Sequence, residues 1–191
     1  MCPTRSSRPP SHRLFLALWP GDTVRCRVRE HAQGWVIPPG SVRYDPPDWH
    51  VTLHFLGRVP AERVPEIAAG IDVPHEPFEL VLDQPRIWPR GLAVIGASKT
   101  PQALKSLHAR LGEALLGMEQ AVEARVYRPH LTLARRAETA VRPDAPVPIV
   151  WPVNGFVLVV STGRTDHRYE VLREYRTLFL PSSSPHRHAS R

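Results

Sequence analysis

The tetrapeptide His-Val-Thr-Leu at residues 50–53 returns as His-Leu-Thr-Leu at residues 130–133, so the two histidines lie 130 minus 50, or 80, positions apart. In a β-strand, residues i and i+2 point to the same side. Each copy therefore places its His and Thr on one face and its two apolar residues on the other. We predict two strands that are anchored in the core by their apolar faces and present a polar pair on a rigid support.

The stretches around these tetrapeptides alternate between short β-like runs and helical patterns, which favours an α+β fold over a helical bundle or a β-sandwich. Helices are expected from Asp22, at 61–71 and after Thr100-Pro101. Strands are expected at residues 13–19, 49–56 (ended by Gly57), 78–83, 92–97, 130–135, 155–162 and 169–180. Each half of the chain thus carries a helix followed by a His-x-Thr-Leu strand, and a pseudo-twofold groove should bring the two strands face to face.

Both ends of the chain differ in composition from its middle. Residues 1–12 and 181–191 are rich in Ser, Pro and Arg and nearly devoid of apolar side chains. Such segments bury too little to offset the entropy of being ordered, so we expect flexible tails around a single bilobal domain at residues 13–180. The apolar run at 14–19 is too short for a secretion signal, and no other stretch approaches the length of a membrane span.

The balance of charged residues points to anionic partners. The net charge is +7, and only two of the 25 basic residues are Lys, which leaves 25 minus 2, or 23, Arg. Guanidinium groups suit phosphate geometry, so nucleic acid is a natural partner; a solvated basic surface and a compositional bias of the genome are the alternatives. With only Cys2 and Cys26, neither a disulfide framework nor a Cys-rich zinc site is available. We expect a cytoplasmic monomer that does not bind membranes.

The paired His and Thr side chains fit one kind of chemistry particularly well. Opening a cyclic phosphodiester with water requires a base for the attacking proton and an acid for the leaving oxygen, and two imidazoles with a pKa of about 6.5 can supply both. The hydroxyls of Thr52 and Thr132 can donate hydrogen bonds to the non-bridging phosphate oxygens. No metal and no cofactor is implied for this reaction.

The repetition of the motif gives it its weight. A single His-x-Thr is weak evidence, because a histidine in a strand is more often a surface or satisfied residue, but two copies on predicted strands in matching halves favour function. His50 and His54 have the i, i+4 spacing of half a zinc site, yet Val51 replaces the glutamate of that motif and the segment favours a strand. Strand alternation places His54 on the face of His50, where we expect it to face solvent rather than to contact substrate.

Four blocks of the sequence carry a family resemblance. They are RLFLAL at 13–18, HVTLHFLG at 50–57, YRPHLTLAR at 127–135 and GRTDHRYEVLREY at 163–175. Together they resemble the two-histidine (2H) phosphoesterase superfamily, in particular its LigT-like RNA 2′,3′-cyclic phosphodiesterase branch. The resemblance implies a bilobal α+β fold, with mainly antiparallel sheets flanked by helices around a central groove. It also implies hydrolysis of RNA 2′,3′-cyclic phosphate ends to 2′-phosphates, with reversible 2′-5′ RNA ligation as a related activity, and it makes His50 the proton donor and His130 the acceptor.

Further candidates surround the motifs. Arg135 could pair with phosphate, although alternation turns it away from Thr132 unless the strand bulges. Phe15 could stack a base, but an aromatic ring in an apolar run is more often core. Phe55 is expected to be core, and Tyr127, Arg128 and Tyr169 are not ranked above ordinary surface residues.

Two rival functions stay open. One is a noncatalytic RNA or nucleotide binder, against which the intact His and Thr pairs argue. The other is a phosphodiesterase that acts on a different cyclic phosphate, such as one derived from ADP-ribose.

Overall fold

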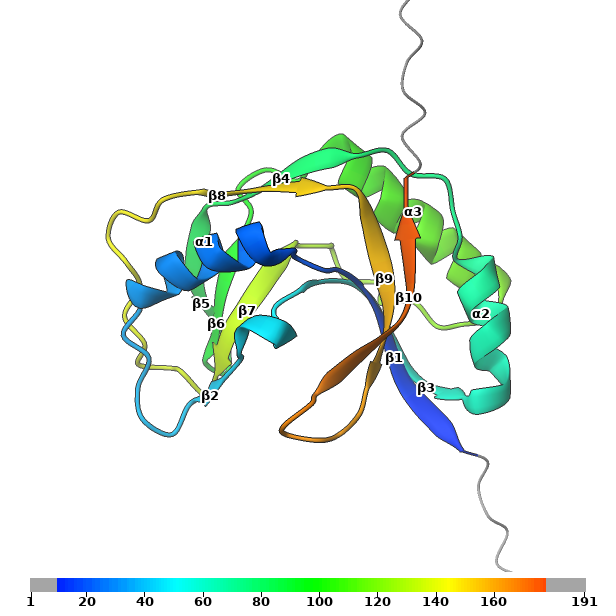
Figure 1. The fold of residues 1–191 in the computed structure, drawn as a ribbon, viewed down its shortest axis with the longest axis horizontal. Helices are drawn as coiled ribbons and strands as arrows, with labels where there is room; N and C mark the ends of the chain where they lie inside the picture. The colour runs from blue at the N-terminus through cyan, green and yellow to red at the C-terminus, as the bar shows by residue number, and fades with distance from the viewer. Residues whose placement is uncertain (1–9, 178–191) are drawn as a thin grey trace, which may run out of the picture.

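The computed structural model describes residues 10–177, which form ten strands, three α-helices and two 3₁₀ turns (Figure 1). The helical elements are α1 (Asp22–Gln33), α2 (Val64–Gly70), α3 (Gln102–Gly117), η1 (Pro46–Asp48) and η2 (Ala61–Arg63). The strands are β1 (Ser11–Leu18), β2 (Val42–Arg43), β3 (Val51–Pro60), β4 (Phe78–Leu82), β5 (Gln84–Trp88), β6 (Leu92–Gly96), β7 (His130–Arg135), β8 (Ile149–Val153), β9 (Gly155–Ser161) and β10 (Tyr169–Arg176).

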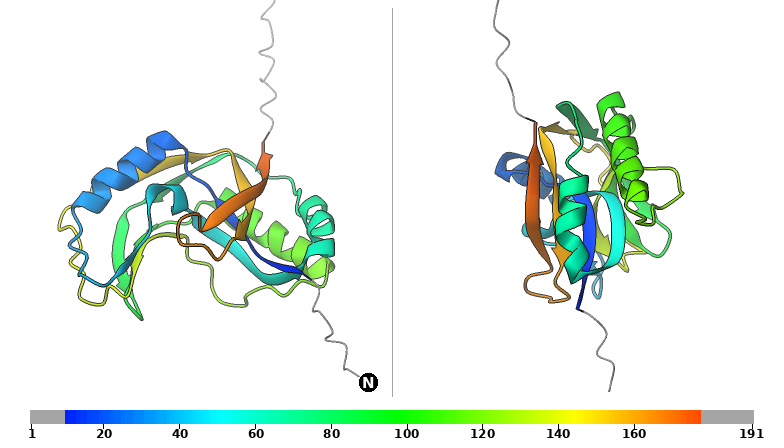
Figure 2. Two further views of the ribbon diagram at one scale, coloured as in Figure 1. Left: turned by 60° about the horizontal axis from the view of Figure 1, so that its bottom comes forward. Right: turned by 90° about the vertical axis from the view of Figure 1, so that its right-hand side faces the viewer.

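The strands form one large and one small antiparallel sheet. The large sheet has the order β10-β9-β1-β3-β7-β6-β5, with β2 paired to β7, and the small sheet pairs β4 with β8. The large sheet bends into an arch, seen from the side in the left panel of Figure 2. At its centre, β3 and β7 are paired only through Val51 and Leu131. The predicted α+β fold with mainly antiparallel sheets is confirmed, but the two motif strands lie side by side in one sheet rather than face to face.

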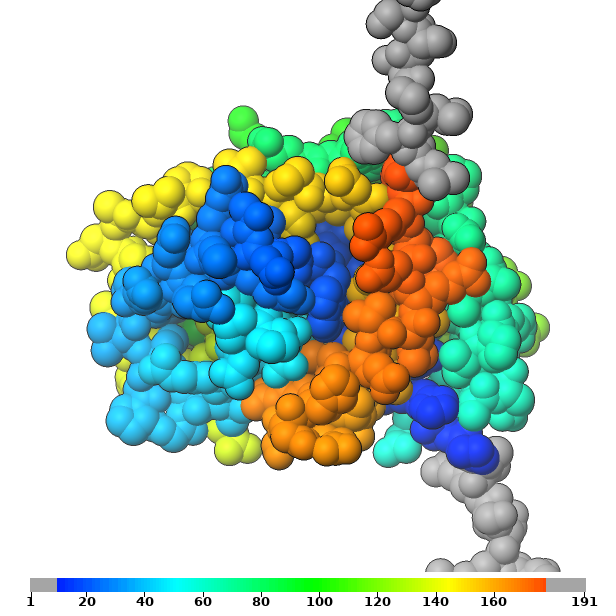
Figure 3. Space-filling view, viewed as in Figure 1, coloured from blue at the N-terminus to red at the C-terminus, as the bar shows by residue number. Residues whose placement is uncertain are grey.

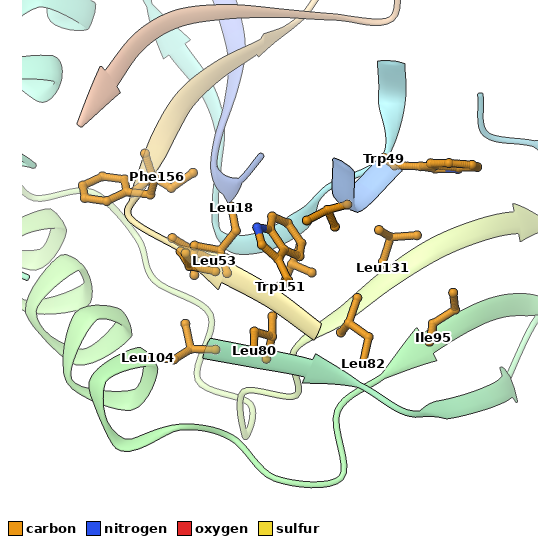
Figure 4. Packing of buried hydrophobic residues seen from close by; sticks show 14 of the residues in the cluster. Leu18, Trp49, Leu53, Leu80, Leu82, Ile95, Leu104, Leu131, Trp151 and Phe156 are labelled. Atoms are coloured by element: carbon orange, nitrogen blue, oxygen red, sulfur yellow. The ribbon is translucent and has the colours of Figure 1, made fainter. Parts of the chain in front are cut away.

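The main core lies between the large sheet and the elements that cover one of its faces (Figure 4). Leu80, Leu82 and Trp151 of the β4–β8 pair lie in one buried cluster with Leu131 and Ile95 of the large sheet. Helix α3 adds a buried stripe of leucines: Leu104, Leu107, Leu111 and Leu115. The apolar residue that follows each motif histidine, Val51 or Leu131, is fully buried in this core. The opposite face of the two strands is thereby left for the polar residues.

Three local features differ from the sequence-based prediction. Strand β1 starts at Ser11, so Ser11 and His12, which we assigned to the N-terminal tail, pair with Pro60 and Val59. Strand β3 does not end at Gly57, because this glycine, at φ +72°, sits at an irregularity of the β1–β3 ladder that the strand passes through. The pattern also missed β2, which is two residues long, and β5 and β8, where Pro85 and Pro152 interrupt the run of strand-forming residues.

Residues 1–9 and 178–191 lie outside the described part of the chain. They comprise the first nine residues of the predicted N-terminal tail, the last three residues of the predicted strand at 169–180, and the whole predicted C-terminal tail at 181–191. Among residues 10–177, no helix combines the length and the apolar character needed to cross a bilayer.

Candidate active site

Both motif strands carry a β-bulge at the leucine of the tetrapeptide. On β1, Leu16 pairs with His54 and the next residue, Ala17, pairs with Thr52, so Leu53 is an extra residue on β3. On β6, Ala93 pairs with Ala134 and Val94 with Thr132, which makes Leu133 the extra residue on β7. A bulge of one residue reverses the alternation of side chains beyond it. The two halves of the sheet therefore share a bulge as well as a motif.

The bulges decide which residues after each tetrapeptide face the groove. His54 and Ala134 are turned into the interior, with His54 only 4% exposed, while Phe55 is 48% exposed and Arg135 is exposed. The predictions that His54 faces solvent and that Phe55 belongs to the core are therefore wrong, for the same physical reason. Alternation without a bulge would have turned Arg135 away from the face of Thr132. The bulge at Leu133 places Arg135 on that face instead.

The central pairing brings the four motif side chains together. Because β3 and β7 run antiparallel and Val51 lies opposite Leu131, the same register sets His50 across from Thr132 and Thr52 across from His130. All four side chains share the face opposite the core and are half-buried. The sheet thus places two His-Thr pairs next to each other with pseudo-twofold symmetry.

Both histidine rings are held in the same way. The Nδ1 atom of His50 lies 2.6 Å from the carbonyl oxygen of Asp48, and that of His130 lies 2.7 Å from the carbonyl oxygen of Arg128. A carbonyl oxygen can only accept a hydrogen bond, so Nδ1 must carry a hydrogen in each ring. In the neutral imidazole, Nε2 is then the unprotonated atom. Each ring is oriented by a backbone group two residues earlier, and neither Nε2 has a hydrogen-bond partner among residues 10–177.

Aromatic side chains surround His50 on three sides. Its ring stacks on Trp19, with centroids 5.5 Å apart and planes 10° apart, and it contacts Phe15 at 4.9 Å and Tyr169 at 5.1 Å. Phe15 is only 3% exposed, so its ring supports His50 and has no free face for a base. The candidate assignment of Phe15 to substrate binding is corrected accordingly, and the core interpretation of its apolar run holds.

Burial of the two rings shifts their protonation. The pKa of His50 is lowered to about 4. Desolvation is the main cause, the hydrogen bond to Asp48 opposes it, and the charges of His130 and Arg135 add to the lowering. Desolvation also lowers the pKa of His130, again opposed by its backbone hydrogen bond and reinforced by Arg125 and Arg135. Both imidazoles are therefore mainly neutral at pH 7 when the groove is empty.

A cluster of cationic groups lies at the His50 end of the groove. The guanidinium of Arg168 lies 4.9 Å from the centroid of Tyr44 and 3.5 Å from the carboxylate of Asp48, while that of Arg135 lies 5.7 Å from the same ring. Within residues 10–177, Arg135 forms no salt bridge. Tyr44 thus holds two guanidinium groups beside the motif, and the charge of Arg135 remains available to an anion.

His54, although it follows the motif, belongs to the support of the site. Its Nε2 donates to the carbonyl oxygen of His108 at 2.8 Å, and its ring stacks on the ring of His108, which in turn stacks on Tyr127. Burial lowers the pKa of both histidines, so the stack is formed by neutral rings at pH 7. Three aromatic rings in contact thereby connect β3, α3 and the segment that leads into β7.

Two hollows lie near these residues, and only one contains motif side chains. The larger, about 560 Å³, lies between the β1–α1 turn, the β8–β9 turn and the end of β10, and contains neither tetrapeptide; it is seen in Figure 3 between α1 and β10. The smaller, about 450 Å³, is lined by Thr52, His130 and Phe55 among others.

No group of three or more His, Cys, Asp or Glu side chains in the described chain is arranged to hold a metal ion.

Several residues around the site were not singled out by sequence reasoning. Tyr169 and Tyr127, which we ranked with the surface, pack on His50 and on His108. Trp88 belongs to β5, a strand that the sequence pattern missed, and the centroid of its ring lies 4.3 Å from that of the His130 ring. The two histidine rings are held by the backbone carbonyl groups of Asp48 and Arg128. Because every residue has such a group, the sequence could not predict these two contacts.

Comparison with known proteins identifies the family. A model of the 2′-5′ RNA ligase superfamily matches residues 27–165. The chain therefore belongs to the 2′-5′ RNA ligase superfamily, and the resemblance to LigT-like two-histidine phosphoesterases is confirmed.

Two relatives carry the same name. An RNA 2′,3′-cyclic phosphodiesterase from Thermus thermophilus is 35% identical over 168 residues, which cover 78% of this chain and 81% of that protein. One from Geobacillus stearothermophilus is 28% identical over 153 residues, which cover 70% of this chain and 47% of that protein, so the chain spans about half of its length. Among solved structures, Escherichia coli LigT complexed with 3′-AMP matches with a TM-score of 0.80 at 24% identity, covering 88% of this chain and 99% of that one.

Proposed function

We propose that this protein hydrolyses RNA 2′,3′-cyclic phosphate ends to 2′-phosphomonoesters, with His50 and His130 as general acid and general base. The observation that carries the proposal is the matched pair of imidazoles, each held through Nδ1–H by a carbonyl oxygen and each without a partner at Nε2 among the residues that the structure describes. The Thermus relative, at 35% identity, is named for this activity, which supports the same reaction here.

The reaction needs one proton to leave the nucleophile and one to reach the leaving group. With the roles implied by the family resemblance, Nε2 of His130 takes a proton from water as the water oxygen bonds to phosphorus. The bond from phosphorus to O3′ breaks, and protonated His50 gives its Nε2 proton to O3′, which leaves the phosphate on O2′. Turnover ends with His50 neutral and His130 protonated, and exchange with solvent restores both. A 5′-hydroxyl in place of water would give a 2′-5′ linkage by the same displacement.

Other groups in the groove would stabilise the phosphate. The hydroxyls of Thr52 and Thr132 are neutral donors beside the two rings, and they can bind the non-bridging oxygens without competing for the transferred proton. Arg135, exposed on the same face after the bulge, supplies a positive charge to the phosphate. Binding of this anion raises the pKa of nearby imidazoles. Substrate itself thus promotes protonation of the acid that burial disfavours.

The products distinguish this reaction from its rivals. With an oligoribonucleotide that ends in a 2′,3′-cyclic phosphate, the protein is expected to be active in EDTA, because both proton transfers use side chains of the chain. The product should be only the 2′-phosphate, because the bond from phosphorus to O3′ is the one that breaks. Chromatography against 2′- and 3′-phosphate standards measures this outcome. Binding without turnover would identify the noncatalytic alternative, and turnover of an ADP-ribose cyclic phosphate in preference to RNA would identify the other substrate.

The pH dependence follows from the shifted rings. Because burial lowers both pKa values below 6.5, kcat/KM is expected to be bell-shaped with its maximum below pH 6.5. Activity is lost below the lower apparent pKa of the pair, where both rings are protonated and no base remains, and above the upper one, where both rings are neutral and no acid remains. Bound phosphate should move the kcat profile to higher pH. Initial rates between pH 4 and 9 test this, and a flat profile between pH 5 and 8 contradicts it.

The setting of the reaction is also a proposal. One chain supplies both motifs and the whole groove, which supports a monomer as the active unit. The free thiol of Cys26 is exposed and fits a reducing cytoplasm.

A further inference from the structure

A small apolar cluster lies on the groove face of the large sheet, opposite the main core. Neighbouring residues of β1 alternate between the two, so Leu16 is part of the main core whereas Phe15 and Ala17 belong to this cluster. The other members of the cluster are Val157, Val159, Trp19, Tyr169 and Val171. Its three aromatic rings are the ones that surround His50. One of the two motif histidines thus lies against an apolar wall on the groove face.

The indole of Trp19 differs from the other two rings in how it meets His50. Its plane is within 10° of the imidazole plane, so the two rings are stacked, whereas Phe15 is tilted by 36° and Tyr169 stands nearly at right angles, at 83°. Tyr169 also stays uncharged at neutral pH, because burial raises its pKa to about 12. A cation over the face of an aromatic ring, within about 6 Å of its centroid, is attracted to the ring, and tryptophan attracts it most strongly. With the two centroids 5.5 Å apart, Trp19 meets this condition for a protonated His50.

The charged groups near His50 make this attraction important. His130 and Arg135 both disfavour a positive charge on the ring. The carboxylate of Asp48, which could have balanced that charge, is paired with the guanidinium of Arg168 at 3.5 Å. The hydrogen bond to the carbonyl oxygen of Asp48 favours the imidazolium but does not overcome the effect of its desolvation. A proton donor buried in this setting therefore needs a further contact that prefers the charged ring, and an aromatic face supplies one without a counter-charge.

We propose that Trp19 is a positioning residue for the general acid, because its indole both orients the ring of His50 and stabilises the protonated form of that ring. The proposal rests on the proposed function, which makes His50 the proton donor. The other motif histidine has a different neighbour, since the centroid of the Trp88 ring lies 4.3 Å from that of His130 but the two planes are tilted by 50°. The aromatic contacts therefore break the pseudo-twofold symmetry of the groove, and they do so in favour of His50 as the ring that carries the proton.

The two limbs of the pH profile test this role separately. Where both histidines are neutral, kcat/KM is proportional to the fraction of molecules whose acid is protonated, and where both are charged, it is proportional to the fraction whose base is deprotonated. In Trp19→Leu, which keeps an apolar side chain but has no aromatic face, kcat/KM for adenosine 2′,3′-cyclic phosphate is expected to fall about 2- to 30-fold on the alkaline limb, the equivalent of about 0.5–2 kcal/mol. The acid limb should change little. Leu116→Ala, which shortens an exposed apolar side chain of α3, is the control and should change neither limb.

The conservative variant Trp19→Phe tests whether the aromatic face is what matters, and it should recover most of the loss on the alkaline limb. In Trp19→Leu with the thermal midpoint of a folded protein, an equal loss on both limbs would mean that the indole only shapes the groove. A gain on the acid limb with an unchanged alkaline limb would mean that His50 is the base, and an unchanged profile would mean that the indole does not act on His50. Each of these three results would overturn the proposal.

A direct titration separates this contact from the chemistry. The pKa of His50 is followed by NMR with and without inorganic phosphate, and His50→Asn identifies the imidazole signals by their loss. Trp19→Leu is expected to lower this pKa by about 0.4–1.5 pH units, which corresponds to the same free energy, whereas the matched variant Trp88→Leu should leave it unchanged. The lowering is expected whether or not the protein hydrolyses the substrate, so an inactive wild type that shows it counts against the proposed function alone. An unchanged or raised pKa in Trp19→Leu would overturn the proposal, and a raised one would show that the indole mainly excludes water from the ring.

Discussion

Replacing either His50 or His130 by Ala is expected to lower kcat for adenosine 2′,3′-cyclic phosphate by about 10²- to 10⁴-fold, the usual contribution of a positioned acid or base. Both rings are fixed through Nδ1 by backbone carbonyl groups, and Nε2 has no partner among the described residues. Removing either ring therefore removes the acid or the base of the proposed reaction. The double variant should lose far less than the product of the two factors, since both rings serve one displacement. Steady-state rates in EDTA measure all three variants.

Two further variants separate proton transfer from structure. His50→Asn can still donate from its amide to the carbonyl of Asp48 and so keeps the local hydrogen bond, but it has no titratable nitrogen and should be as inactive as the Ala variant. His12→Ala, an exposed histidine of β1 remote from the motifs, should be fully active. Unchanged turnover in both motif variants, with thermal midpoints that show folded protein, would end the assignment of these rings as acid and base.

The repeated tetrapeptide predicted more of the site than it did of its surroundings. The apolar and polar faces of both strands follow from two-residue periodicity, so the burial of Val51 and Leu131 and the shared face of His50 and Thr52 were accessible from sequence. Beyond each leucine the periodicity fails, because a bulge inserts one residue without a characteristic side chain. This single event accounts for the misplacement of both His54 and Phe55.

The remaining gaps have a different physical origin. The carbonyl groups that orient the histidines belong to residues 48 and 128, and their position depends on how the chain bends into each strand. The packing of Tyr169 on His50 requires β10, β9, β1 and β3 to lie in that order, a long-range arrangement that local patterns do not specify. Sequence periodicity thus predicts the reacting groups better than the contacts that tune them.

Removing either threonine hydroxyl is expected to produce the next largest loss. Thr52→Val or Thr132→Val keeps the shape of the side chain but deletes the donor, and kcat should fall about 10²-fold, the lower end of what one donor to a developing oxyanion contributes. The loss should be smaller than that of a histidine because Arg135 still faces the phosphate. Rates with adenosine 2′,3′-cyclic phosphate at the optimum pH measure it.

The serine variants provide the control, since Thr52→Ser and Thr132→Ser keep the hydroxyl and should recover most of the activity. If a hydroxyl binds the phosphate more strongly as charge develops, the valine variants lower kcat more than they raise KM. A rise in KM alone would show that the hydroxyl binds ground state and transition state equally. Equal losses in the serine and valine variants would show that the methyl group, not the hydroxyl, matters. Because each threonine lies across from the histidine of the other strand, the two valine variants should also resemble each other, as the pseudo-twofold symmetry of the groove requires.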